Sequence, residues 1–343
     1  MSLTRRARRT WRIILSINLA SGVVSACFSV LSAPDGANPW VSALFGVIAS
    51  TMIATPIVFF ELRSASQGPL RRLRRLPLVL FFAIKVLVYL AVIICALILV
   101  RLLFMPSMPD RFTLGSLFEG LAFAAAMSVF GNLVFEMGRL LGFGTLKNFL
   151  TGRYVHPKRE ERAFLLIDMK DSTGLAERLG AIRFHELLNL FFRDIADAAL
   201  ECEAEIHKYV GDEAIPTWPS KRALADGDVL TCPFIALDFI AANRSQYSKR
   251  FGVAPEFRAA LHYGEIVAGE IGDLRREIAY VGDTLNVAAR LLDAAKTLRR
   301  DVLVSADLLA RSALPAGVVA EPLPTLAVRG REAPLEIAAL SRA

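Results

Sequence analysis

Apolar residues crowd into the chain before residue 140, whereas apolar and polar residues are interspersed after it. The first part contains four long apolar stretches, at residues 13–31, 40–60, 76–104 and 117–135. A helix needs about 20 residues to cross the hydrocarbon core of a membrane, which is roughly 30 Å thick. Each stretch therefore predicts a membrane-spanning helix, and together they predict an α-helical membrane bundle.

The pattern changes after residue 162 to short apolar runs and amphipathic segments. Residues 163–168 predict a strand, residues 175–203 a helix, and residues 204–218 a hairpin around Gly211-Asp212. Further elements are predicted in the order helix, strand, strand, strand, helix, at residues 230–247, 256–262, 266–271, 278–281 and 283–295. The order βαββαβ is that of a ferredoxin-like α+β unit.

These patterns divide the chain into a membrane domain (1–136), a linker (137–162) and an α+β domain (163–343). Within the linker, Gly142-Phe143-Gly144 interrupts the continuation of the last apolar stretch. A short amphipathic helix is predicted over residues 145–152. Such a segment is suited to couple the two domains, and a passive tether is an equally good interpretation.

The charge distribution predicts how the bundle is oriented. The chain carries a formal charge of +7, and its mean hydropathy is +0.45. Arginines cluster at residues 5–9 and 63–75, whereas residues 32–39 contain no basic residue and residues 105–116 contain only Arg111. By the positive-inside rule, the N-terminus and the α+β domain are cytoplasmic and the protein is a multi-pass protein of the inner membrane. Nucleic-acid binding is not expected, because the basic residues are not interleaved with aromatic ones on a soluble surface.

One basic residue, Lys85, falls inside an apolar stretch. A charge at the centre of a membrane helix costs about 3 kcal/mol on insertion scales. Lys85 is only nine residues from Leu76 at the start of its stretch. We therefore expect its side chain to snorkel to the cytoplasmic surface.

Four polar residues of the α+β domain form a set suited to phosphoryl transfer. Asp168 closes an apolar strand, and Asp212 lies in a Gly-Asp turn. Asn286 and Arg290 are four residues apart and share a helix face. Two acids that can hold divalent metals, with an amide and a guanidinium, fit this chemistry. Taken singly, each acid is better explained as a strand-end or turn residue. Asn286 and Arg290 could also face solvent, but their apolar neighbours favour burial.

Residues 162–340 are similar to the catalytic domain of class III nucleotidyl cyclases, most closely to bacterial adenylate cyclases. The similar segments are, in order, Phe164-Leu165-Leu166-Ile167-Asp168, Lys208-Tyr209-Val210-Gly211-Asp212, Val281-Gly282-Asp283-Thr284-Leu285-Asn286-Val287-Ala288-Ala289-Arg290 and the weaker Val328-Arg329-Gly330. The resemblance implies the conversion of ATP to 3′,5′-cyclic AMP and pyrophosphate. It also implies a head-to-tail homodimer, in which one subunit supplies Asp168, Lys208 and Asp212 and the other supplies Asn286 and Arg290.

The resemblance also implies individual roles. Two Mg²⁺ or Mn²⁺ ions would be held at Asp168, Met169 and Asp212. Asn286 would orient the ribose or triphosphate, and Arg290 would neutralise the pentacoordinate phosphate. The remaining substrate-binding positions are Lys208, which would read adenine, Ala279, Arg329 for the triphosphate (with Arg331 as a rival), and the backbone of Ser172, Thr173 and Gly174 for phosphate oxygens. Family members commonly have Asp or Thr where this chain has Ala279, so adenine selectivity rests mainly on Lys208.

Three other functions compete with this interpretation. A diguanylate cyclase is opposed by Val210, which replaces a glycine of that family's turn, and by the Asn286-x-x-x-Arg290 helix, which has no role there. A guanylate cyclase is opposed chiefly by Lys208, whereas a relaxed-purine cyclase stays an alternative because Ala279 has no polar side chain. A non-catalytic nucleotide-binding sensor would be expected to lack a metal acid or the arginine, and this chain has all of them.

Overall fold

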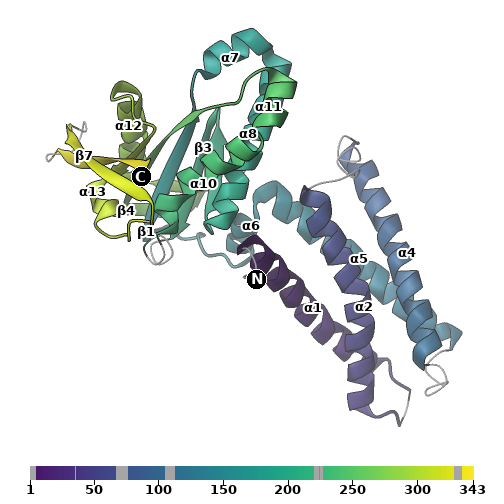
Figure 1. Ribbon diagram of the computed structural model, residues 1–343. Coiled ribbons are helices and arrows are strands. Elements are labelled where there is room, and N and C mark those ends of the chain that lie inside the picture. The colour runs from purple at the N-terminus through teal and green to yellow at the C-terminus, as the bar shows by residue number, and fades with distance from the viewer. Residues whose placement is uncertain are drawn as a thin grey trace. The chain divides into compact units, whose positions relative to one another are not determined.

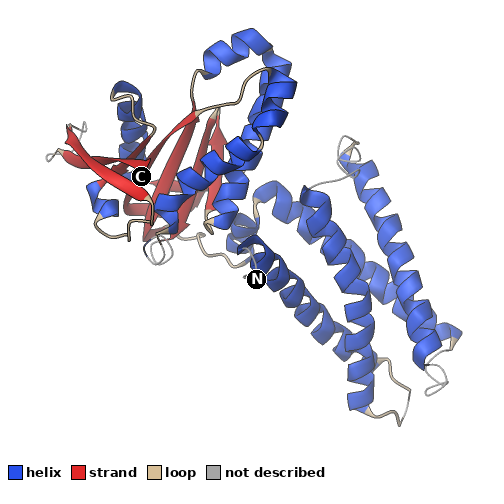
Figure 2. Cartoon of the chain, viewed as in Figure 1, coloured by secondary structure: helices blue, strands red, loops and turns tan. Residues whose placement is uncertain are grey.

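The structure is a computed structural model that describes residues 5–34, 36–66, 76–104, 113–219, 224, 227–327 and 334–343. The chain forms two compact units, Met1–Leu141 and Gly142–Ala343. The first runs from purple to blue in Figure 1, and the second from teal to yellow. Helices make up the first unit, whereas the second contains the strands (Figure 2).

The first unit contains α1 (Arg5–Leu31), α2 (Pro39–Ser66), α4 (Leu78–Phe104) and α5 (Leu114–Leu141). Each has a segment long and apolar enough to cross a membrane, namely Ile14–Leu31, Pro39–Glu61, Val79–Leu102 and Leu114–Gly138. Large apolar side chains such as Leu19, Leu87 and Phe118 are exposed, as expected for surfaces that face lipid. Four candidate membrane helices were predicted, and the structure confirms them.

Lys85 does not snorkel, so that prediction is wrong. Its side chain is buried, with Nζ 2.5 Å from Glu61 Oε1 and 2.8 Å from Glu136 Oε1. Tyr89, one turn further along α4, donates a hydrogen bond from its hydroxyl to Glu61. The physical reason is that α2 and α5 each bring a carboxylate to the lysine, so its charge is compensated inside the bundle.

In the second unit, α6 (Phe143–Leu150) precedes an eight-stranded sheet of order β2-β3-β1-β4-β6-β8-β7, and β5 pairs with β4. The strands β2, β3, β1 and β4 are antiparallel neighbours in the order of a ferredoxin-like unit. This confirms the predicted fold class. The other bounds are β1 (Lys158–Met169), α7 (Ser172–Leu179), α8 (Ala181–Glu201), β2 (Glu205–Val210), β3 (Glu213–Pro219), α10 (Asp228–Ala242), α11 (Arg244–Phe251), β4 (Phe257–Ile271), β5 (Glu277–Val281), α12 (Asp283–Thr297), β6 (Val302–Ser305), α13 (Ala306–Leu309), β7 (Val318–Leu326) and β8 (Leu335–Arg342).

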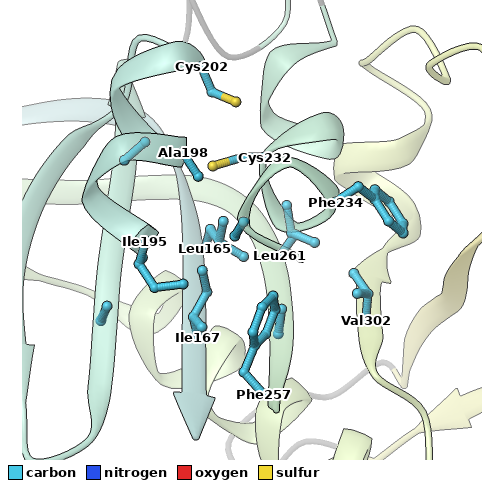
Figure 3. Packing of buried hydrophobic residues seen from close by; sticks show 14 of the residues in the cluster. Leu165, Ile167, Ile195, Ala198, Cys202, Cys232, Phe234, Phe257, Leu261 and Val302 are labelled. Carbon is cyan, nitrogen blue, oxygen red and sulfur yellow. The ribbon is translucent and has the colours of Figure 1, made fainter. Parts of the chain in front are cut away.

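Both faces of the sheet are covered. Leu165 and Ile167 of β1 pack on one face with residues of α8 and α10, among them Ile195 and Cys232 (Figure 3). Phe164 and Leu166, which alternate with them, pack on the other face with Val287, Ala288 and Leu291 of α12. A strand that is buried on both faces needs apolar residues at every position, which explains the unbroken apolar run of β1.

The structure corrects three predicted boundaries. The strands predicted at 256–262 and 266–271 are one strand, β4, which passes through Gly264. A Cβ at Gly264 would lie 2.6 Å from Thr284 Oγ1, so the missing side chain lets α12 lie close to the sheet. The helix predicted over 175–203 is divided at Gly180, whose φ is 75°. The helix predicted over 230–247 is divided at Asn243.

Candidate active site

Asp168 and Asp212 lie next to each other at one end of the central strands. Asp168 is the penultimate residue of β1, and its Cα pairs with that of Glu213 in β3. Asp212 lies in the β2–β3 turn directly after Gly211, whose φ of 61° suits a tight turn. The hairpin therefore brings Asp212 beside Asp168.

The two aspartates interact unfavourably when both are charged. Burial, followed by repulsion from Asp212 and a hydrogen bond with it, raises the pKa of Asp168 to about 6. Burial, followed by the charges of Asp168, Asp212 and Asp293, raises the pKa of Glu213 to about 7. Arg258 and Lys296 act in the opposite direction on the pKa of Asp168. Like charges are thus concentrated at this end of the sheet.

This donor set fits a divalent cation of the Mg²⁺ class. Two adjacent carboxylates offer the oxygen ligands that Mg²⁺ and Mn²⁺ prefer, and a bound cation would relieve their repulsion. Among the described residues, no three His, Cys, Asp or Glu side chains converge on one point. Mg²⁺ sites are commonly built from one or two carboxylates completed by substrate phosphates. Met169 could contribute only its backbone carbonyl, because its side chain is buried in the core.

The segment after Asp168 begins a short helix, as predicted. Ser172 is the first residue of α7, and Asp171 precedes it in the left-handed conformation with φ 53°. Thr173 is exposed, and Ser172 and Gly174 are partly buried. The Asp171 carboxylate lies against Gly174, where a Cβ would be 2.5 Å from Asp171 Oδ1. The phosphate-binding role of this backbone stays a prediction.

Lys208 extends from β2 towards β5. Its Nζ is 3.8 Å from Glu277 Oε1, and its side chain is 39% exposed. Glu277 is the first residue of β5, and the buried Ala279 follows two positions later. Since β5 leads directly into α12, this contact favours placing Lys208 in the half of the site that contains Asn286. That assignment differs from the sequence interpretation, which grouped Lys208 with Asp168 and Asp212.

Asn286 and Arg290 lie on the exposed face of α12, so the prediction of their burial is wrong for the single chain. The neighbours that suggested burial, Val287 and Leu291, are rotated by about 100° along the helix and face the sheet instead. Among the described residues, no hydrogen bond or ion pair joins Asn286 or Arg290 to Asp168 or Asp212. Asn286 and Arg290 therefore make no described side-chain bond to the two acids within one chain.

Arg329, and its rival Arg331, lie outside the described residues. Three charged residues near the site were not predicted from the sequence, namely Glu213, Lys170 and Glu277. Lys170 forms ion pairs of 2.6 Å with Asp301 and 3.2 Å with Glu256 at the end of β1. Glu213 could have been found from its position directly after Asp212, whereas the partners of Lys170 and Lys208 are distant in the sequence.

Residues 155–334, just over half of the chain, match the family model described as the adenylate and guanylate cyclase catalytic domain. The chain therefore belongs to the class III nucleotidyl cyclases, a family whose members bind nucleotides, generally use divalent metal ions and are dimeric.

Among curated proteins, the chain is 44% identical to adenylate cyclase 2 of Rhizobium meliloti (strain 1021) over 218 residues, which cover 63% of this chain and 60% of that relative. It is 28% identical to an uncharacterised protein of Mycobacterium tuberculosis (strain H37Rv) over 179 residues, covering 51% of this chain and 32% of the relative. The chain thus spans less than two thirds of either relative. Among solved structures, a bacterial light-regulated adenylyl cyclase shares the fold, with a TM-score of 0.52 and 17% identity over 63% of this chain and 64% of that one.

Proposed function

We propose that this protein is an adenylate cyclase that converts ATP to 3′,5′-cyclic AMP and pyrophosphate at sites formed between two copies of the chain. The observation that supports this most directly is the pair Asp168 and Asp212, two carboxylates held side by side at a cost in repulsion. Clusters of acids with raised pKa values are typical of functional sites. The 44% identity to an adenylate cyclase supports ATP as the substrate.

In this proposal, Asp168 and Asp212 hold the divalent cations, with the backbone carbonyl of Met169 as a further ligand. Bound cations would lower the pKa of the ribose 3′-hydroxyl and neutralise charge on the triphosphate. A bond then forms between the 3′-oxygen and the α-phosphorus, and the bond to the bridging oxygen of the leaving pyrophosphate breaks. The hydroxyl proton passes to solvent.

The exposed face of α12 supplies the rest of the site in the homodimer. Arg290 stabilises the charge that grows on the α-phosphate, a role suited to a planar and permanently charged group. Asn286 orients the ribose or the triphosphate. Because both side chains are exposed in one chain, a second copy can approach them without disturbing the core. Each homodimer then contains two complete sites.

Lys208 donates a hydrogen bond to N1 of adenine. Guanine carries a proton at N1, so a lysine there discriminates against it. Ala279 offers no polar side chain, so the preference for adenine depends on Lys208 and on how its position is fixed.

The four apolar helices anchor the enzyme in the cell membrane, with its N-terminus and catalytic unit in the cytoplasm. This orientation is the one in which the catalytic unit meets cytoplasmic ATP.

The test is an assay of the purified full-length protein in lipid nanodiscs with Mn²⁺ and either ATP or GTP, with products identified by mass spectrometry. Cyclic AMP that is lost in Asp212→Ala but kept in Glu321→Gln supports the proposal; Glu321 is an exposed glutamate of β7 paired with Arg300. Cyclic GMP in comparable yield would instead indicate a relaxed-purine cyclase. The absence of any cyclic product from the wild-type protein would indicate a nucleotide-binding domain without activity.

A further inference from the structure

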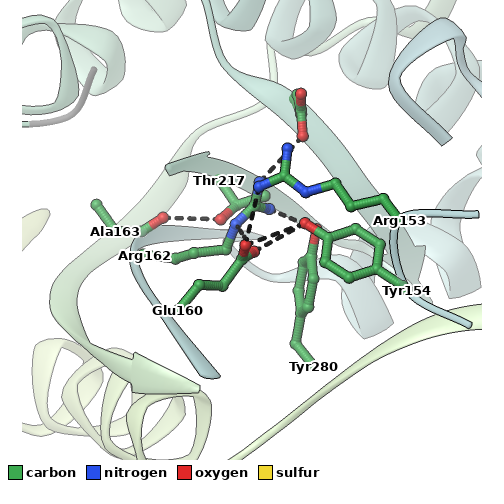
Figure 4. A network of polar contacts seen from close by, with 8 residues as sticks. Arg153, Tyr154, Glu160, Arg162, Ala163, Thr217 and Tyr280 are labelled. Carbon is green, nitrogen blue, oxygen red and sulfur yellow. Dashed lines mark hydrogen bonds and ion pairs between the residues drawn. The ribbon is translucent and has the colours of Figure 1, made fainter. Parts of the chain in front are cut away.

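Arg162 is a buried arginine at the centre of a polar network on β1 (Figure 4). Its Nη2 lies 3.2 Å from Glu205 Oε2, and its Nε lies 3.0 Å from Glu160 Oε1. Its Nη1 donates a hydrogen bond to the hydroxyl of Tyr280. Tyr154, which is also buried, donates from its hydroxyl to Glu160 at 3.0 Å. One guanidinium thus joins β1, β2 and β5.

Aromatic contacts hold the same group in place. The guanidinium carbon of Arg162 lies 4.7 Å from the centroid of the Tyr280 ring. That ring stacks on His207 at 4.4 Å and meets Phe164 edge-on at 5.8 Å. Burial raises the pKa of Tyr280 to about 12, so the hydroxyl stays neutral and can accept the bond from Arg162. The network is therefore both packed and hydrogen-bonded.

The positions of β2 and β5 in the sheet explain why this bridge matters. Within the described part of the chain, the strand β2 pairs with β3 alone, and β5 pairs with β4 alone. Since β1 lies between β3 and β4, three strands separate β2 from β5 along the backbone hydrogen bonds. The distance between β2 and β5 is therefore set by side chains. Three side-chain contacts span them: the stacking of His207 on Tyr280, the bridge that Arg162 makes from Glu205 to Tyr280, and the longer ion pair of Lys208 with Glu277, at 3.8 Å.

Both bridged strands carry the residues placed in the base pocket. On β2, Glu205 is three residues before Lys208, and His207 is adjacent to it. On β5, Tyr280 directly follows Ala279. A shift of the Arg162 bridge would consequently move Lys208 relative to Ala279.

We propose that Arg162 is a positioning residue that, through Tyr280 and Glu205, fixes the spacing of Lys208 and Ala279 and thereby sets the affinity and selectivity for the purine base. Arg162 acts mainly on nucleotide recognition, because it does not contact the reacting phosphate. This inference rests on the proposed function, because it takes Lys208 as the base-reading residue. It assigns to Arg162 part of the selectivity that Ala279 cannot supply through a polar side chain.

An arginine suits this position better than a lysine. Its planar fork can address Glu160, Glu205 and Tyr280 in different directions at once, whereas a lysine ammonium is a compact point charge. If Arg162 only stabilised the fold, a lysine that kept the charge would preserve nucleotide recognition whenever it preserved folding. If Arg162 positions the two strands, a lysine would preserve folding and still weaken recognition.

The main test uses Tyr280→Phe in the full-length protein, because this change removes one hydroxyl and keeps the ring that stacks on His207 and Phe164. We expect the KM for ATP to rise by about tenfold while kcat changes by less than about threefold. The preference for ATP over GTP should also fall by about tenfold. Tyr263→Phe is the matched control, since its ring packs in the α8 and α10 core on the other side of β1, and the hydroxyl that it loses donates to the exposed Glu161 at 2.7 Å. It should change neither quantity.

Two further measurements keep the outcomes distinguishable. Arg162→Lys should melt near the wild-type temperature yet show the same shift in KM and in nucleotide preference as Tyr280→Phe. Binding of ATP and GTP analogues with a methylene bridge between the α- and β-phosphates, measured by calorimetry, tests selectivity without turnover. Loss of ATP preference in binding supports the role of Arg162 even if no cyclic product forms. Wild-type preference and KM in both variants, in an active enzyme, would overturn the role of Arg162 and leave the proposed function intact.

Discussion

The two units place their charges in opposite ways. In the membrane unit, Lys85 lies between Glu61 and Glu136, so opposite charges from three helices are paired. In the catalytic unit, Asp168 and Asp212 lie side by side, so like charges repel. In the membrane unit, two carboxylates compensate the buried charge of a lysine. In the catalytic unit, two carboxylates repel each other, and a bound cation would relieve this repulsion.

This difference separates a structural role from a functional one. Helices in lipid gain little from burying apolar side chains against each other, so polar bridges contribute to their association. The catalytic unit has a covered sheet with two apolar cores, so it can tolerate a destabilising acid pair at one end. Removing the lysine should therefore lower the stability of the membrane unit, whereas removing one of the two aspartates should raise the stability of the metal-free catalytic unit.

The largest expected effect is the loss of activity in Asp212→Asn. Turnover should fall by at least about a thousandfold, because a ligand of the cations is removed. In the absence of metal, however, the catalytic unit should melt at a higher temperature than wild type, because the repulsion with Asp168 is gone. Turnover assays and melting curves in EDTA measure the two effects. Mn²⁺ should raise the melting temperature of wild type and of Glu321→Gln, but not of Asp212→Asn; an unchanged response to Mn²⁺ would show that Asp212 is no ligand.

Lys85→Met should lower the stability of the membrane unit, which is opposite to the effect expected for Asp212→Asn on the metal-free catalytic unit. Removing the lysine leaves Glu61 and Glu136 without that cation, and breaking a buried ion pair costs about 3–5 kcal/mol. Unfolding of the full-length protein in bicelles by titration with SDS measures the loss. The double variant Lys85→Glu with Glu61→Lys restores the same set of charges and should recover most of the stability. Equal stability of wild type and Lys85→Met would show that the ion pairs of Lys85 do not stabilise the membrane unit.

The shared site gives a third prediction. Arg290→Ala should lower kcat by about a hundredfold, as expected for a group that stabilises charge in the transition state. Because Arg290 is exposed, the free energy of unfolding should change by less than about 0.5 kcal/mol. Mixing equal amounts of Asp212→Ala and Arg290→Ala chains should restore about a quarter of wild-type activity, since half of the dimers are mixed and each has one intact site. Mixtures that stay as inactive as their components would exclude a site shared between subunits.

Local sequence patterns predicted most of the fold, because most helices, strands and turns are determined by residues within the element itself. The apolar run of β1, the Gly211-Asp212 turn and the periodicity of α12 each lie within a few residues of the feature they determine. The partners of Lys85 could not be found in this way, since Glu136 is 51 residues away and comes from another helix. The exposure of Asn286 was misjudged because residues adjacent in sequence lie on different faces of a helix. The Arg162 network joins β1 to β2 and β5, which are distant from it in the sequence, so only the folded chain reveals it.

The smallest expected effect is a pH dependence at His207, whose ring stacks on Tyr280 beside Arg162. Burial, followed by the charges of Lys208 and Arg162, lowers the pKa of His207 to about 4, below its ordinary value of 6.5. The folded state therefore favours the neutral ring, and this contribution to stability is fully present above pH 6.5 and is lost as the pH falls towards 4.

Trp218, buried in the catalytic unit, can report its unfolding by fluorescence once Trp11 and Trp40 are replaced by Phe. His207→Phe keeps a stacked ring that cannot be charged, so the free energy of unfolding of wild type should fall relative to this variant between pH 7 and pH 5. His185→Phe, at an exposed position of α8, should follow wild type. Parallel pH curves for wild type and His207→Phe would mean that His207 is not held neutral by the Arg162 network.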